Sequence, residues 1–352
     1  MARSLTDAEA RVIGVLLAGT PGLERERLRV AAVPRSTFHA ARRRAYAEEW
    51  VIDRYVPDPP YLGRPRATFL LLRPYADHLA HASETLASNS DNVLLWTSGQ
   101  LVLGVYLHSS AGSARALADT VRESQSASWS FHVDAELDGP AVPVYFDYEG
   151  LWSHLVGLPG TAGYPRGLGG TPRPVGDDLA GKPSATGWAA SGLIRRPFEA
   201  ALQGKGGHLV GPFGLPWAQQ KLLRAGHIAH RVFLHPGRSP PYQGRGADQV
   251  VFVTGSLVPG ARPENLFSRL TRESRVFPFL YAADREHVLL GALGRPPGIA
   301  GSDVEREERA PVLPILGESL RGIEIVQDVA ANVSAPVDHR YDRLLESTSR
   351  LA

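Results

Sequence analysis

The stretch that decides the fold is residues 50–66, which read WVIDRYVPDPPYLGRPR. Its first part is rich in β-branched and aromatic residues, and its second part is rich in Pro and Gly, as expected for a strand followed by a turn. An apolar run, residues 67–72, begins directly after it. The stretch therefore predicts a wing of two short strands around a Pro/Gly turn, next to a second domain that begins with a strand.

Three helices are predicted upstream of the wing. Thr6 and Glu9 have the spacing of a capping box, and the apolar residues that follow recur at helical spacing: Val12, Ile13, Leu16 and Leu17. A second helix is expected over Leu23–Ala32, and Pro34 or Ser36 then opens a third that runs to about residue 50. Three helices with a tight turn before the third are typical of a helix-turn-helix, whose third helix enters the major groove of DNA.

Positive charge is concentrated in the same region. The whole chain has a formal net charge of only +2, but residues 25–66 contain ten arginines and five acidic residues, so the other 310 residues are slightly acidic. A basic segment on an acidic body favours one surface that contacts phosphate. The simpler alternative is a solvated, charged helix face.

The third helix and the wing supply the candidate contacts with double-stranded DNA. We expect Phe38, Ala41 and Tyr46 to pack inward and the polar residues to face outward. The candidate DNA-binding residues are Arg35, Ser36, Thr37, His39, Arg42, Arg43, Arg44, Arg64 and Arg66.

Residues 67–148 follow the order β-α-β-β-α-β, which is that of a ferredoxin-like sandwich. The expected strands are residues 67–72, 92–97, 101–107 and 142–146, and the expected helices are residues 75–87 and 113–124. Together with the helices upstream, this order places the chain in the α+β class.

With these residues in place, the chain resembles the Lrp/AsnC family of transcriptional regulators. The residues that match the segment after the family's recognition helix are Val51, Ile52, Tyr55, Asp58, Pro59, Leu62 and Gly63, and Trp50 replaces a glycine. The resemblance implies a winged helix joined to a ferredoxin-like sandwich, sequence-specific DNA binding and a small-molecule effector. It places the effector beside the hairpin of Ser98, Gly99 and Gln100, from which the family's usual aspartate is absent.

An internal repeat indicates that this unit occurs twice. Residues 59–64, PPYLGR, recur as PPYQGR at 240–245, and residues 142–151 align with 335–344. The predicted domains are a winged helix-turn-helix (1–66), a sandwich (67–158), a Gly/Pro-rich linker (159–186), a degenerate winged helix (187–247) and a second sandwich (248–352). We expect the two sheets to pair within one chain as two subunits would, and the whole chain to form a homo-oligomer such as a dimer.

Other classes of protein find less support in the sequence. The chain has no cysteine, and its twelve histidines show no HExxH or similar metal-ligand spacing. No phosphate-binding loop is present either, so we expect no enzyme activity, catalytic residue, metal or cofactor. Without an apolar run of about 20 residues or a signal-peptide pattern, we expect a cytoplasmic protein with no membrane partner.

Two alternatives remain open at this point. The same pairing of domains resembles the siroheme decarboxylases, which use His and Arg side chains on a tetrapyrrole. The winged helices could instead bind another protein. Binding to nucleic acid at two salt concentrations separates this last alternative from DNA binding, because phosphate contacts make affinity fall steeply with salt.

Overall fold

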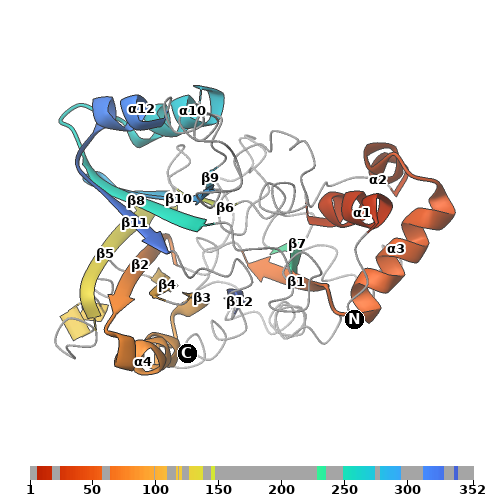
Figure 1. The fold of residues 1–352 in the computed structure, drawn as a ribbon, viewed down its shortest axis with the longest axis horizontal. Helices are drawn as coiled ribbons and strands as arrows, with labels where there is room; N and C mark the ends of the chain where they lie inside the picture. Colours follow the sequence, from red (N-terminus) through yellow and green to blue (C-terminus); the bar gives the residue numbers. More distant parts are fainter. Residues whose placement is uncertain are drawn as a thin grey trace, which may run out of the picture.

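The structure is a computed structural model that combines helices and antiparallel sheets in an α+β fold (Figure 1). It describes residues 6–17, 24–57, 64–98, 100–108, 116–117, 119–120, 127–137, 144–146, 228–234, 249–273, 278–294, 312–328 and 337–339. The predicted linker, most of the second winged helix and most of the predicted helix at 113–124 lie outside the described residues.

The N-terminal helical module consists of α1 (Asp7–Leu17), α2 (Glu24–Ala31) and α3 (Arg35–Ala47). The predicted capping box is confirmed: the Thr6 N–H donates to Glu9 Oε2 at 2.9 Å, and the Glu9 N–H donates to Thr6 Oγ1 at 3.3 Å. The three predicted helices are present, and α1 and α3 pack through their buried apolar residues, among them Val12, Ile13, Leu16, Phe38, Ala41 and Ala45.

One residue before α3 and one residue after it have left-handed backbone conformation. Ala32, between α2 and α3, has φ 50°, and Glu49, just after α3, has φ 53°. At the end of α3 the Trp50 N–H donates to the Ala45 carbonyl at 2.8 Å and the Glu49 N–H donates to the Tyr46 carbonyl at 3.1 Å. This is a Schellman motif, and it ends α3 three residues before the predicted position.

Replacing Ala32 with glycine is expected to stabilise the helical module, because glycine adopts a positive φ without the steric cost that alanine incurs. We expect the free energy of unfolding to rise by about 0.5–1 kcal/mol, measured by urea denaturation. The matched control is Ala40→Gly on the exposed side of α3, which should lower it by about 1 kcal/mol. A loss of stability in both variants would contradict the assignment of strain to Ala32.

The wing differs from its prediction. Strand β1 (Val51–Pro57) pairs antiparallel with β7 (Ile228–Leu234), which belongs to the second half of the chain. A local hairpin is disfavoured because Pro59 and Pro60, which follow β1 closely, lack the N–H that a ladder requires. The first half therefore supplies one strand of this two-stranded sheet, and the second half supplies the other.

The first sandwich sheet has the strand order β12-β3-β4-β2-β5, and all its pairs are antiparallel. Its strands from the first half are β2 (Arg66–Pro74), β3 (Asn92–Ser98), β4 (Leu101–His108) and β5 (Ala127–Glu136), and β12 (Val337–His339) comes from the second half. A short 3-10 helix, η2 (Ala76–His78), leads into α4 (Leu79–Ser88), which covers the sheet's outer face.

The second sheet repeats this plan with the order β11-β8-β10-β9-β6. Its strands are β8 (Gln249–Leu257), β9 (Pro278–Ala283), β10 (His287–Gly294), β11 (Leu320–Asp328) and, from the first half, β6 (Val144–Phe146). Helices α10 (Pro263–Glu273) and α12 (Val312–Ser319) cover its outer face.

One predicted strand was assigned to the wrong sheet. Residues 144–146 do form a strand, but β6 pairs with β9 in the second sheet, and the fourth strand of the first sandwich is β5. The period-2 signal for β5 is the alternation of Phe131, Val133 and Ala135 with polar residues. The alternation runs without interruption from Ala127 to Glu136, so this strand could have been predicted from the sequence.

The described strands support the internal duplication. The two halves exchange strands reciprocally: β6 joins the second sheet beside β9, and β12 joins the first sheet beside β3. A β-bulge also recurs at the same place. Val93 in β3 has no pairing partner in β4, and Phe279 in β9 has none in β10. Two units with the same strand order and the same bulge are therefore present in one chain.

The two sheets pack face to face between outer layers of helices, giving four layers (Figure 1). In β2, Ala67, Phe69 and Leu71 face the second sheet, whereas Leu70 and Leu72 face α4. The Trp96 and Phe252 rings meet between the sheets with their centroids 5.5 Å apart. The expected pairing of the two sheets within one chain is confirmed.

Candidate functional site

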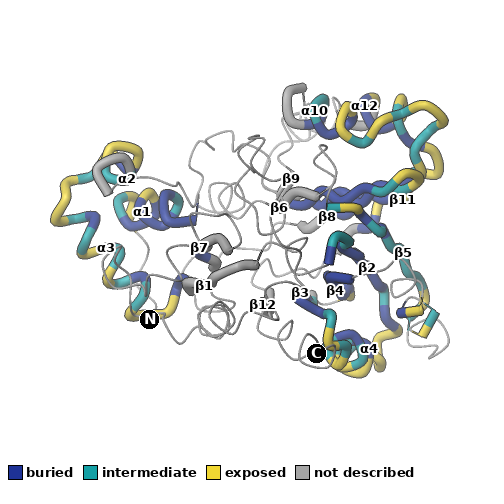
Figure 2. The backbone as a smooth tube through the Cα atoms, turned by 180° about the vertical axis from the view of Figure 1, so that it is seen from behind, coloured by how far each residue is buried: buried dark blue, intermediate teal, exposed yellow. Residues whose placement is uncertain are grey.

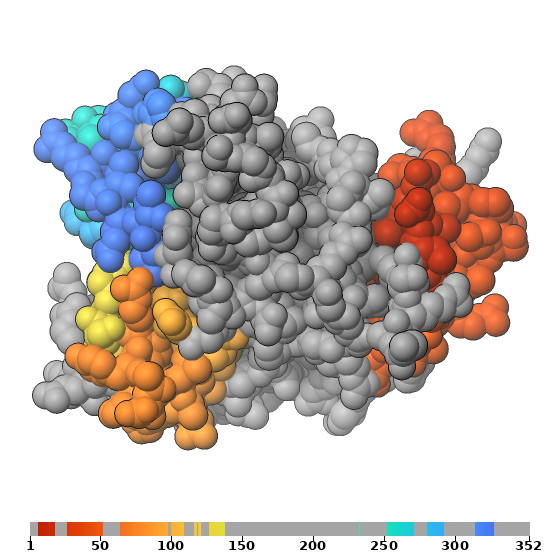
Figure 3. Space-filling view, viewed as in Figure 1, coloured from red at the N-terminus to blue at the C-terminus, as the bar shows by residue number. Residues whose placement is uncertain are grey.

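Helix α3 lies at the end of the molecule opposite the sandwich, and Figures 2 and 3 show the helical module standing out there. Its exposed residues include Arg35, Ser36, Ala40, Arg43 and Ala47, which we call the outer face of α3. The last four are spaced by four, three and four residues, so they form one stripe along the helix. Three of these four side chains are small, which would let the helix backbone approach a flat or grooved partner closely.

The three consecutive arginines of α3 have different environments. Arg43 is exposed and pairs with no carboxylate of the described residues, and the Arg42 guanidinium lies 5.9 Å from the centroid of the Tyr46 ring. Arg44 points back into the module, where it contacts two carboxylates and a ring. Only the first two arginines of the run are therefore placed to contact a partner.

Arg44 joins α3 to α1. Its Nη1 lies 2.8 Å from Glu9 Oε1, its Nε lies 2.6 Å from Glu48 Oε1, and its guanidinium lies 4.9 Å from the centroid of the Trp50 ring. Glu9 is buried, and it also completes the capping box with Thr6. Arg44 thus holds the module together, and we leave it out of the proposed DNA contacts.

Burial raises the pKa of Glu9, but the hydrogen bonds from Thr6 and the Arg44 guanidinium outweigh it and hold that pKa below its ordinary value. A carboxylate with a lowered pKa stabilises the folded state above its unfolded pKa, about 4.3 for glutamate. We expect the module to lose about 1 kcal/mol as the pH falls below that value, measured by urea denaturation. The Glu9→Gln variant should be less stable at neutral pH and should lack this pH dependence.

The other predicted residues of α3 lie around its N-terminus. Arg35 and Ser36 are exposed, and Thr37 and His39 are half-buried. Arg35 Nε lies 3.4 Å from His39 Nε2, and the His39 ring packs edge-on against Phe38 at 6.0 Å between centroids. The first turn of α3 therefore presents a cation and a hydroxyl side chain together.

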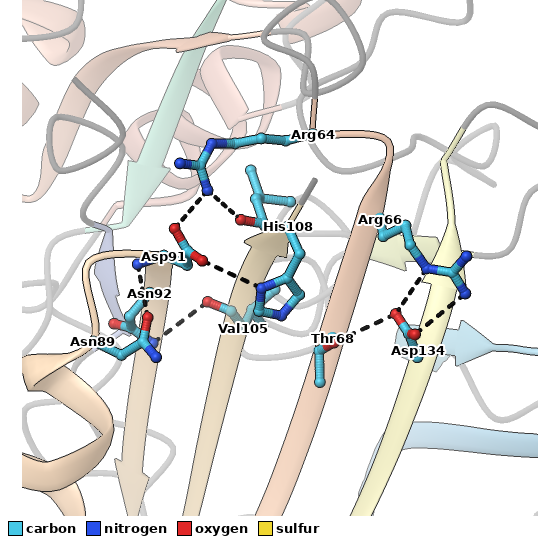
Figure 4. Close-up of polar contacts among 10 residues, drawn as sticks. Arg64, Arg66, Thr68, Asn89, Asp91, Asn92, Val105, His108 and Asp134 are labelled. Atoms are coloured by element: carbon cyan, nitrogen blue, oxygen red, sulfur yellow. Dashed lines mark hydrogen bonds and ion pairs between the residues drawn. The ribbon is translucent and has the colours of Figure 1, made fainter. Parts of the chain in front are cut away.

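Arg64 lies on the sandwich, in a cluster that we call the junction network: Arg64, Asp91, Asn92 and His108 (Figure 4). Arg64 is 6% exposed, and its Nη1 lies 2.6 Å from Asp91 Oδ1 and 2.5 Å from the Leu107 carbonyl oxygen. The His108 ring lies on the other side of Asp91, with Nδ1 3.4 Å from Oδ2. A buried arginine held in this way is not available to DNA. We therefore do not include Arg64 among the proposed DNA-binding residues.

Burial raises the pKa of Asp91, but hydrogen bonds from His108 and Arg64 outweigh it and hold that pKa below its ordinary value. Asp91 is therefore the anion that compensates the buried Arg64 guanidinium. Its backbone N–H donates to Asn89 Oδ1 at 2.8 Å, which fixes the turn before β3.

Arg66 is also held by carboxylates of the sandwich. Its Nη2 lies 3.2 Å from Asp134 Oδ2 (Figure 4), and its Nη1 lies 3.2 Å from Glu136 Oε1. Thr68 Oγ1 donates to the same Asp134 carboxylate at 3.4 Å. These contacts join β2 to β5, and Arg66 is not part of the outer face of α3.

The predicted effector turn is only partly described: Ser98 ends β3, Gln100 is exposed, and Gly99 lies outside the described residues. In the second half the equivalent turn contains an aspartate that the sequence analysis missed. Asp284 Oδ1 accepts from the Glu286 N–H at 2.8 Å and the His287 N–H at 2.7 Å. Aligning the hairpin at residues 98–101 with its counterpart at residues 283–287 would have found this residue.

Asp284 also connects the two halves, because its Oδ2 accepts from the Asp134 N–H at 3.1 Å. Nearby, Trp129 Nε1 donates to Glu324 Oε2 at 2.9 Å, and the Phe131 and His287 rings meet edge-on at 5.7 Å. Within the described ranges no group of three or more His, Asp or Glu side chains is placed to hold a metal ion. None of the described helices is long and apolar enough to cross a membrane.

Comparison with known proteins gives matches among solved structures only. No family model and no curated protein matches the chain. The chain is similar to E. coli AsnC with a TM-score of 0.30 and 14% identity, over 39% of this chain and 95% of that one. It is also similar to the siroheme decarboxylase NirDL, with a TM-score of 0.43 and 9% identity over 98% and 99% of the two chains. For NirDL in co-complex with an iron-uroporphyrin III analogue the TM-score is 0.42, with 8% identity over 98% and 100%.

Proposed function

We propose that the chain is a sequence-specific DNA-binding transcriptional regulator whose α3 enters the major groove. The observation that carries the proposal is the outer face of α3, where Arg35 and Arg43 flank the small side chains of Ser36 and Ala40 at the far end of the molecule. Small residues allow close approach to the base edges, and arginines at the rim reach phosphates or guanines. Arg42 lies beside this face, half-buried against Tyr46.

Binding of the full chain to a labelled duplex at two salt concentrations tests the proposal. The duplex should carry the region upstream of the chain's own gene, because many regulators bind there, and a scrambled duplex serves as the control. Binding that weakens steeply with salt and prefers the upstream duplex supports the proposal, because phosphate contacts release counterions. Absence of binding at low salt would favour a module that binds a protein partner.

A tetrapyrrole enzyme is the second candidate. It gains support from Arg66 and His108, an Arg and a His that are paired across β2 and β4 in the first sheet and not on the helical module, whereas Arg64 is engaged with Asp91. These side chains are of the types that siroheme decarboxylases use, although Arg64 and His108 are buried here. A change in Soret absorbance when iron-uroporphyrin III is added to the chain would support this candidate, and an unchanged spectrum would count against it.

The proposal includes a small-molecule effector and a homo-oligomeric state. Size-exclusion chromatography with light scattering measures the oligomeric state directly, and a two-fold related DNA site would require an even number of chains. The effector would be recognised as a compound that shifts the affinity for the duplex without changing its salt dependence.

A further inference from the structure

Two buried polar atoms of the junction network have no hydrogen-bond partner in the described part of the chain: His108 Nε2 and Asn92 Oδ1. His108 is 1% exposed and Asn92 is 0% exposed, so bulk water cannot satisfy them. Native proteins rarely leave buried polar atoms unpaired, and a roomy polar site normally holds an ordered molecule instead.

The two side chains lie on the same face of the first sheet. Asn92 is paired across the strands with Tyr106, and His108 is two residues further along β4, stacked on the Tyr106 ring at 6.1 Å with the planes 7° apart. Residues related in this way lie on one face of a sheet as diagonal neighbours, about 7–8 Å apart at Cα. A single small molecule on this face is therefore the simplest partner for both atoms.

Both unpaired atoms are acceptors. Asp91 Oδ2 lies 3.4 Å from His108 Nδ1, and because a carboxylate can only accept, the proton of the neutral imidazole lies on Nδ1 and its Nε2 carries a lone pair. The Asn92 amide nitrogen donates to the carbonyls of Leu94 at 3.1 Å and Val105 at 3.4 Å, so its oxygen must be the free atom. The occupant therefore has to donate two hydrogen bonds.

Charge restricts the occupant further. Arg64 and Asp91 already form a compensated ion pair in this interior, at 2.6 Å. An ammonium group would add an unpaired cation close to the buried guanidinium, which is strongly unfavourable. A neutral donor fits, such as water or the hydroxyl or carboxamide group of a small ligand.

The second half of the chain serves as an internal comparison. In the paired registers, the positions equivalent to Asn92 and His108 are Pro278 and Gly294. The second sheet forms the same strand order with neither polar side chain. The site is therefore not a requirement of the fold, and it occurs in the half that follows the helical module.

We infer that His108 and Asn92 bind one small neutral molecule that donates a hydrogen bond to each of them. The occupant completes the network through which Asp91 holds Arg64, the residue at which the chain enters the first sandwich. This inference does not depend on the proposed DNA binding.

A crystal structure of the full chain, combined with native mass spectrometry, tests the inference. We expect electron density between His108 Nε2 and Asn92 Oδ1. A single-atom peak with no mass adduct identifies water, and extended density with an adduct identifies a co-purified ligand. Nitrogen-15 NMR of the histidines should show an unprotonated Nε2 on His108. Absence of density, or a protonated Nε2 bonded to a protein oxygen, would overturn the inference.

Two variants keep the test specific. His108→Phe preserves an aromatic ring against Tyr106 and removes the acceptor, so the density should disappear. Thr68→Val is the matched control, because Thr68 is buried on the same sheet and already has Asp134 as its partner. Density that remains in His108→Phe, or that is lost in Thr68→Val, would overturn the assignment of the site to His108.

Discussion

Replacing Arg42 and Arg43 together with glutamine is expected to weaken duplex binding by at least about tenfold, and to lower the slope of log affinity against log salt by about 2. The reason is that both arginines lie on or beside the outer face of α3, and neither forms an ion pair with a carboxylate of the described residues. Each phosphate contact that is removed leaves one counterion on the DNA. Fluorescence anisotropy at four salt concentrations gives both quantities.

Arg44→Gln is the matched control for this prediction. Arg44 has the same side chain as Arg42 and Arg43 but points into the helical module, where it contacts Glu9, Glu48 and Trp50. We expect this variant to lower the melting temperature of the helical module while leaving the salt slope unchanged at temperatures where it is folded. If Arg44→Gln reduces the slope as much as the double variant, the division of the arginine run is wrong.

Replacing Asp91 with alanine should destabilise the sandwich by about 3 kcal/mol, the lower end of the range for a broken buried ion pair. The Arg64 side chain is only 7% exposed. Without Asp91 its positive charge therefore stays buried, and its Nη1 still donates to the Leu107 carbonyl oxygen. The hydrogen bond from His108 is lost as well. Urea denaturation of the full chain, with a slope checked for two-state behaviour, measures the change.

Removing both charges is the control for Asp91. Arg64→Met combined with Asp91→Ala eliminates the cation together with its partner, and it should be less damaging than Asp91→Ala alone. A double variant at least as unstable as the single one would contradict the claim that Asp91 acts by compensating Arg64.

The local features of the fold could be predicted from the sequence because they depend on neighbours in the chain. The capping box of Thr6 and Glu9 is set by residues three apart, and the turn before α3 is set by Pro34. The duplication was detectable because the PPYLGR segment recurs as PPYQGR, with one position changed, and the structure repeats the strands in the same order.

Contacts between distant residues could not be predicted in this way. Whether an arginine on α3 faces outward or toward α1 depends on how the two helices cross, and only the coordinates place Arg44 beside Glu9. Nothing in the sequence near Arg64 identifies Asp91 as its ion-pair partner, because Asp91 follows α4, far along the chain. The exchange of β6 and β12 likewise depends on how the sheets pack, because a three-residue strand has no preference for one sheet over another.

The most direct measurement of the central claim uses the absence of cysteine from the chain. A single Ala40→Cys substitution on the outer face of α3, labelled with a short photo-crosslinker, should crosslink efficiently to bases of the bound duplex. The same label on Glu84→Cys, exposed on α4 of the sandwich, should not. Crosslinking from position 84 but not from position 40 would contradict the account, because the surface that meets DNA would then be the sandwich.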